Sequence, residues 1–242
     1  MVKFGRVIVV LLLAVLVTAQ PVCAAGFFER FIGKLDLMKT TKLSDTKISD
    51  GLREALKVAM NNTINLIGKT DGYLKNDSIR IPMPNQLKTL ESVLRKVGFS
   101  NQVDDFILSM NRSAEAAAPF ARDIFIDAIM NISFKDAKNI LNGTDTAATD
   151  YFRNATSDSL AKVFRPHVDK TLGKYGVTKK YQDLITLYKT VPFSRSFPLP
   201  DIEQYVVRKA MDGLFNVLAL EERKIRTDPS ARVTKLLKEV FK

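Results

Sequence analysis

An amide, a guanidinium and a carboxylate lie close together in an alanine-rich stretch of the chain, at Asn111, Arg112 and Glu115. Asn111 and Glu115 are four residues apart, so on a helix they share a face whose other positions are apolar. Such a face is partly buried, and buried polar groups need partners. Either Arg112 binds an anionic headgroup in a polar pocket, or the three side chains form an interhelical network of hydrogen bonds and ion pairs. We take Asn111, Arg112 and Glu115 as the candidate ligand-binding residues and keep both interpretations.

The usual catalytic groups are scarce. His167 is the only histidine, Cys23 is the only cysteine, and no G-x-S-x-G elbow accompanies them. Glu221 and Glu222 are adjacent, so on a helix they diverge by about 100 degrees, and we interpret them as solvated or ion-paired. We predict no catalytic residue, no metal site and no cofactor. A carboxylate-dependent hydrolase remains a distant alternative, because it needs only two acidic side chains.

The first residues have the order of a secretory signal peptide. Lys3 and Arg6 precede an apolar run over residues 7–17, and the small residues Ala24 and Ala25 follow. The run is too short to cross a bilayer, which needs about 20 apolar residues. We therefore predict that residues 1–25 are a cleaved signal peptide and that the mature protein is periplasmic or otherwise exported. No transmembrane helix is expected after cleavage.

Two features near the predicted cleavage site have alternatives. Lipidation of Cys23 is less favoured, because the bulky Val22 occupies the position where lipoprotein signals carry a small residue. Residues 26–48 are rich in phenylalanine and basic residues, which predicts a short amphipathic helix at a membrane interface. The same segment could instead be an arm that docks on the protein or stays disordered.

The chain is strongly basic, with a net charge of +11. An exported basic protein is attracted to anionic lipid headgroups, acidic glycans or extracellular nucleic acid. The repeated pairing of basic and aromatic residues that single-strand binders use is missing, so we do not expect nucleic acid. The candidate partners are an anionic lipid, an envelope glycan or another envelope protein.

Apolar residues recur with helical spacing over residues 49–242, and we find no alternation long enough to build a sheet. This pattern predicts a single all-α domain, an irregular bundle of about eight or nine helices. The stripe over residues 120–132 is the most regular and is expected in the core. Arg208 with Asp212 and Glu222 with Arg226 have the spacing of ion pairs on one long helix.

The ends of several helices are also predicted. Pro119 suits the first turn of a helix, and Ser133 with Asp136 resembles a capping box. Thr144 or Asp145 is expected to cap the helix that follows. The last helix is expected to start at Asp228.

Five blocks in a fixed order carry a family resemblance: "GLREALKVAMNNTINLIGKTDGYLKNDSIRIPMP", "MNRSAEAAAP", "DAKNILNGTDTAATDYF", "KAMDGLF" and "EERKIRTDP". From about Gly51 to the C-terminus the chain resembles the bacterial domain-of-unknown-function 4197 family. The resemblance implies an exported or envelope-associated helical protein. It implies no activity, cofactor or partner, and it supplies no catalytic residues to transfer.

Our leading hypothesis is a non-enzymatic periplasmic or envelope protein that binds an anionic or amphipathic envelope component. The alternative is a protein interaction or assembly factor without a small ligand. A pocket lined by apolar side chains and containing Arg112 would favour the first, and a packed core with an exposed apolar patch would favour the second.

Overall fold

The computed structural model describes residues 45–192 and 199–241, and the regular structure of these residues is helical throughout. Their α-helices are α2 (Asp45–Ile67), α3 (Lys88–Lys96), α4 (Ser100–Ala117), α5 (Ala121–Met130), α6 (Phe134–Leu141), α7 (Ala147–Lys174), α8 (Val177–Thr190), α9 (Ile202–Thr227) and α10 (Lys235–Val240). Short 3-10 turns lie at Asn85–Leu87, Ala118–Phe120 and Pro229–Ala231. The all-α prediction with eight or nine helices is confirmed. The predicted signal peptide (1–25) and residues 26–44 of the predicted arm lie outside the described residues.

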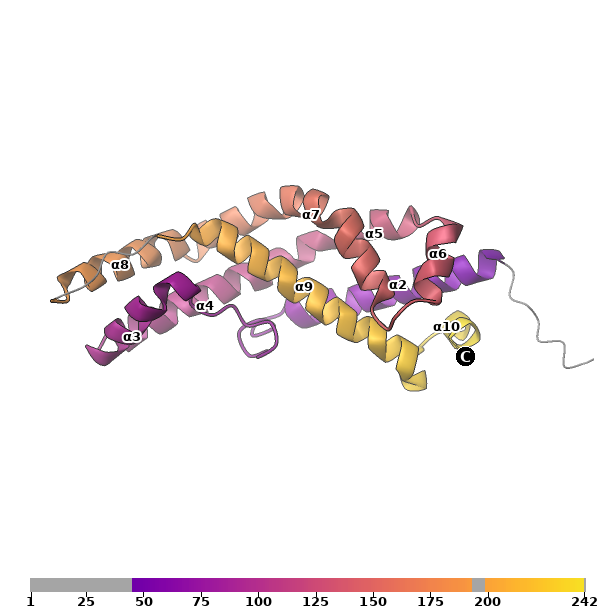
Figure 1. The fold of residues 1–242 in the computed structure, drawn as a ribbon, viewed down its shortest axis with the longest axis horizontal. Coiled ribbons are helices and arrows are strands. Elements are labelled where there is room, and N and C mark those ends of the chain that lie inside the picture. Colours follow the sequence, from indigo (N-terminus) through magenta and orange to yellow (C-terminus); the bar gives the residue numbers. More distant parts are fainter. Residues whose placement is uncertain (1–44, 193–198, 242) are drawn as a thin grey trace, which may run out of the picture. The chain divides into compact units, whose positions relative to one another are not determined.

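Aromatic packing holds α5, α7 and α9 together. Phe125 of α5 is fully buried, and its ring centroid lies 5.8 Å from Phe152 of α7 and 5.7 Å from Phe215 of α9. Both contacts are edge-to-face, a geometry that adds about 0.5–1.5 kcal/mol per pair to the gain from burial. In Figure 1 α9 runs beside α7 over part of its length and then crosses α2, and it packs against both.

The stripe over residues 120–132 lies in the core as predicted, except at its first position. Ala121, Phe125 and Ile129 are fully buried, whereas Phe120 is 46% exposed. The Phe120 ring stacks on His167 of α7 with a centroid distance of 3.7 Å. Phe120 therefore covers the surface of α7 and does not enter the core.

Several helix ends follow local rules. Pro119 lies in the 3-10 turn between α4 and α5, as its fixed backbone angle favours. The Ser133 hydroxyl accepts the backbone N–H of Asp136 at 3.1 Å and caps α6. Gly98 ends α3 with φ of 94°, a conformation that glycine adopts without steric cost. The ends predicted at Pro119 and Ser133 are confirmed, because each depends on residues within one turn.

The predicted cap of α7 was wrong. α7 begins at Ala147, after Thr144 and Asp145, and the carboxylate that receives its first N–H groups comes from Glu222 of α9. A helix N-terminus attracts any carboxylate that reaches it, including one from a distant part of the chain. Packing of α9 against α7 therefore replaces the local cap.

The predicted start of the last helix was also wrong. Asp228 accepts the N–H of Ser230 at 2.8 Å and closes a 3-10 turn, and α10 begins only at Lys235, with Thr234 as its N-cap. Arg232 donates to two backbone carbonyls in the last turn of α9, at 3.0 and 2.8 Å. These bonds fold the connection back onto the end of α9, so the chain turns before a new helix can start.

Candidate functional site

An open groove of about 380 Å³ lies between α7 and α9, and we call it the α7–α9 groove. Its residues fall on one face of each helix, at steps of three or four positions with adjacent pairs between them, as the 3.6-residue turn allows. They are Arg153, Ser157, Asp158, Ala161 and Arg165 of α7 and Gln204, Val207, Arg208, Met211, Asp212 and Phe215 of α9.

The floor of the groove is apolar. Val207 and Phe215 are buried beneath it, and Met211 is partly exposed to it. The guanidinium carbon of Arg153 lies 4.7 Å above the centre of the Phe215 ring. This cation–π contact is worth about 0.5–1 kcal/mol at an exposed site, and it places a positive charge directly over an apolar surface.

Three arginines surround this floor, and none of them is held tightly. Arg153 approaches the carboxylate of Asp212 at 3.7 Å and Arg165 that of Glu203 at 3.5 Å. Arg208 has no carboxylate within 4 Å among the described residues, so the predicted pair of Arg208 with Asp212 does not form. Exposed pairs of this kind are worth about 0–1 kcal/mol. Exchanging them for a ligand anion therefore costs little.

Glu203, the partner of Arg165, holds its proton more strongly than an ordinary glutamate. Partial burial raises the pKa of Glu203, and the hydrogen bond and charge of Asp169 raise it further, followed by the charge of Asp201. One side-chain oxygen of Asp169 is buried without a hydrogen-bond partner in the described part of the chain. Protonation of Glu203 would reduce the negative charge beside Arg165.

Asn111 is fully buried, and all its polar atoms contact backbone groups. Its amide oxygen accepts the N–H of Ile81 at 2.9 Å, and its amide nitrogen donates to the carbonyls of Ile81 at 2.9 Å and Ile107 at 2.8 Å. Asn111 thus pairs with both backbone groups of Ile81, much as a neighbouring strand would. This pairing fixes the end of the connection between α2 and α3 onto α4.

Glu115 fixes the start of the same connection. One carboxylate oxygen accepts the N–H groups of Tyr73 and Leu74, both at 3.1 Å, and the other accepts from Arg112 at 2.6 Å. Arg112 also donates to Asp71 at 2.7 Å, and its hydrogen bonds to Glu115 and then Asp71 raise its pKa. Asp71 has φ of 68°, so this network holds the residue in a backbone conformation that residues other than glycine rarely adopt.

The structure therefore gives all three predicted residues internal contacts: Arg112 and Glu115 form an ion pair, and Asn111 bonds separately to the backbone of Ile81 and Ile107. None of the three lines the α7–α9 groove. Direct binding of a ligand by Asn111, Arg112 and Glu115 stays a prediction.

The connection that they hold reaches α9. The Tyr73 hydroxyl donates to the carbonyl of Ala210 at 2.6 Å, and its ring packs where a Cβ atom on Gly213 would lie 2.6 Å from a ring carbon. Because Gly213 carries no side chain, the connection can approach α9 closely. Arg80 of this connection is thereby placed beside α9.

A second, smaller hollow of about 100 Å³ forms at this contact, and we call it the polar hollow. Its lining comes from the connection and from α9: Ser78, Ile79, Arg80, Lys209, Asp212, Gly213 and Asn216. Asp212 lines both this hollow and the α7–α9 groove, so the two are neighbours on α9. Sequence reasoning missed both sites, although the spacing of Arg153, Ser157, Ala161 and Arg165 on one helical face was visible.

Two further properties bear on function. Within residues 45–192 and 199–241 no three histidine, cysteine, aspartate or glutamate side chains are grouped so that they could hold a metal ion. None of the described helices combines the length and the apolar character needed to cross a bilayer.

Comparison with known proteins identifies the family. The family model described as protein of unknown function (DUF4197) matches residues 42–242, so the chain belongs to this family. Neither a curated protein nor a solved structure matches the chain.

Proposed function

We propose that this protein is a non-enzymatic binding protein of the bacterial cell envelope and that its α7–α9 groove holds an anionic amphiphile. The proposal rests on one observation: three weakly held arginines surround an apolar floor in an open groove of about 380 Å³. Ligand sites usually range from about 300 to 1,000 Å³ and combine an apolar lining with a few polar groups. The signal-peptide pattern supports a periplasmic location, which N-terminal sequencing of the protein from a periplasmic fraction would test.

Each part of such a ligand has a place in the groove. An acyl chain over Val207, Met211 and Phe215 would remove apolar surface from water, which is favourable by roughly 25 cal/mol per Å². A headgroup anion would pair with Arg208, which has no carboxylate partner among the described residues, or displace Asp212 from Arg153. Both parts of an amphiphile are thus recognised by neighbouring side chains.

Hydrolysis is less well supported by the same groove. Asp158 and Asp212 line it from opposite helices, but both are exposed, and Asp212 faces Arg153. A carboxyl group that acts as a general acid near neutral pH needs an environment that withdraws it from water. The groove therefore favours binding over acid–base chemistry.

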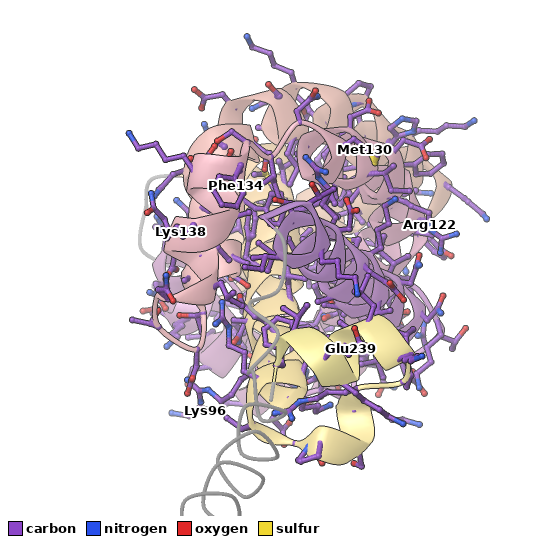
Figure 2. The ribbon with its side chains drawn as sticks, turned by 90° about the vertical axis from the view of Figure 1, so that its right-hand side faces the viewer. Lys96, Arg122, Met130, Phe134, Lys138 and Glu239 are labelled. Atoms are coloured by element: carbon purple, nitrogen blue, oxygen red, sulfur yellow. The ribbon has the colours of Figure 1, made fainter. Side chains whose placement is uncertain are left out.

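Calorimetric titration with soluble amphiphiles tests the proposal. We expect dodecanoate to bind and the uncharged dodecyl maltoside to bind much more weakly. Arg208→Gln should weaken dodecanoate binding about tenfold, the value of one charge-assisted contact. Arg122→Gln is the matched control, because Arg122 of α5 lies on the outside of the domain and lines neither hollow (Figure 2). Equal affinities for the two amphiphiles, or equal losses in both variants, would refute the proposal.

An assembly role is the second candidate, and a different surface supports it. Met130 at the end of α5 is 54% exposed and Phe134 at the start of α6 is 38% exposed. Figure 2 shows these two side chains on one end of the domain, with Arg122 and Lys138 on its two flanks. A photocrosslinker placed at Met130 should then trap one defined envelope protein that a crosslinker at the exposed Lys96 does not. The same products from both positions would exclude this role for the patch.

A further inference from the structure

We propose that the polar hollow is a phosphate subsite, and that the amphiphile in the α7–α9 groove carries a phosphate headgroup. This inference rests on the proposed function and names the class of ligand. It begins from two cations, Arg80 and Lys209, which converge on a hollow of about 100 Å³. That volume equals the space of about three water molecules in the liquid, which suits a single tetrahedral oxyanion.

The charges of the polar hollow favour an anion. Neither Arg80 nor Lys209 has a carboxylate within 4 Å among the described residues, so both keep their full capacity to donate hydrogen bonds. Asp212 is the one acidic residue in the lining, and its carboxylate lies 3.7 Å from the guanidinium of Arg153. Arginine and lysine are the side chains that proteins use most often to hold phosphate oxygens.

The backbone of the hollow is fixed by contacts with α9 and α4, whereas the side chains of Arg80, Asp212 and Asn216 that line it are exposed. Asn216 of α9 donates to the carbonyl of Ser78 at 3.2 Å, which ties the connection to α9 beside Arg80. On the other side of Arg80, the backbone of Ile81 is paired with the buried Asn111. Asn111 is therefore a positioning residue for this site, because its contacts fix the backbone next to Arg80.

The position of the hollow explains why a phosphorylated amphiphile suits both sites. Asp212 lines the hollow on one side and the groove on the other, so a headgroup in the hollow leaves the apolar floor at Met211 and Phe215 free for a chain. A carboxylate headgroup is smaller and carries one charge, whereas a phosphate monoester carries up to two and offers three terminal oxygens to Arg80 and Lys209.

Calorimetric titration of the protein with dodecyl phosphate, dodecanoate and inorganic phosphate tests this inference. We expect dodecyl phosphate to bind about tenfold more tightly than dodecanoate, and Lys209→Gln to remove this preference. Lys138→Gln, which removes the same charge from α6, should keep it (Figure 2). Asp212→Asn should tighten binding of dodecyl phosphate, because it removes the one negative charge that both sites share. Such a gain cannot come from damage to the fold.

The outcomes separate this inference from the proposed function. If dodecanoate binds through Arg208 but dodecyl phosphate has no advantage, the phosphate subsite is refuted and the amphiphile groove stands. If neither amphiphile binds, both proposals fail. If inorganic phosphate alone binds as tightly as dodecyl phosphate and depends on Lys209, the subsite is supported as one for free phosphate, and its link to the groove is refuted.

Discussion

Replacing Glu222 by alanine tests the joint between helices, by which we mean the contact of α9 with the C-terminus of α6 and the N-terminus of α7. The Glu222 carboxylate accepts the N–H groups of Ala148 and Thr149, both at 2.9 Å, and the Thr149 hydroxyl at 2.8 Å. It also pairs with Arg226 at 3.0 Å, and Arg226 donates to the carbonyl of Ile140 at the end of α6 at 2.8 Å. An acidic group thus lies at a helix N-terminus and a basic group at a helix C-terminus, as the helix dipoles favour.

The expected cost follows from burial. The side chains of Arg226 and Glu222 are 10% and 6% exposed, so the pair has little contact with water. Removing one member of a buried pair leaves an uncompensated charge and typically costs about 3–5 kcal/mol. The lost cap of α7 is part of this value, since an N-cap alone contributes about 0.5–2 kcal/mol. We therefore expect Glu222→Ala to lower the free energy of unfolding by about 3–5 kcal/mol.

Urea unfolding followed by circular dichroism measures this change. With a urea dependence of roughly 2–3 kcal/mol per molar, the midpoint should fall by about 1–2.5 M. Hydrogen exchange adds a local measurement, because the amides of Ala148 and Thr149 should lose protection before the rest of α7. Glu221→Ala is the matched control. Glu221 is about as buried as Glu222, with 8% of its side chain exposed, but its partners Lys224 and Asn62 are exposed and can turn to water when it is removed. Its loss should therefore cost less, only about 1 kcal/mol. Equal costs for the two variants would show that the joint does not stabilise the fold as we argue.

Three further outcomes are expected. Asn111→Ala leaves both backbone groups of Ile81 buried without a partner and should lower the free energy of unfolding in urea by about 2–3 kcal/mol. A loss below about 0.5 kcal/mol would show that Asn111 does not hold this backbone in place. Gly213→Ala places a Cβ atom 2.6 Å from the Tyr73 ring and should lower the free energy of unfolding by about 2 kcal/mol, or Tm by about 4–8 °C. An unchanged Tm would mean that the connection between α2 and α3 can move away from α9. Because the raised pKa of Glu203 makes the folded state bind more protons, stability should fall as pH rises from the ordinary value of 4.5 through the raised pKa. Glu203→Gln should flatten this part of the stability curve, and a variant that keeps the slope would refute the assignment.

The helices could be predicted because their signals are local. Apolar residues at helical spacing, Pro119 in a first turn and Ser133 as a cap act within about four residues, and the structure confirms each. The errors lie where a distant group acts. Glu222 replaces the expected caps Thr144 and Asp145 because packing of α9 brings a carboxylate to α7 from more than seventy residues away.

The candidate site was harder to predict for the same reason. The sequence drew attention to Asn111, Arg112 and Glu115, because polar groups on an apolar helix face need partners. It could not reveal that those partners are backbone groups at Tyr73 and Ile81, since a backbone N–H is present at every residue except proline. In the sequence the arginines of the α7–α9 groove look like ordinary surface charges. They surround one groove only because α7 and α9 pack side by side.

The sequence by itself determined the fold class, the family, the basic character and some helix ends, because periodicity and capping are properties of neighbouring residues. Only the tertiary structure decided that Glu222 caps α7, that Asp212 faces Arg153 instead of Arg208, and that an apolar floor lies beneath three arginines. The physical reason is that helix packing selects which of many polar and charged side chains meet. That selection depends on the shapes of whole helix faces, which no short stretch of sequence contains.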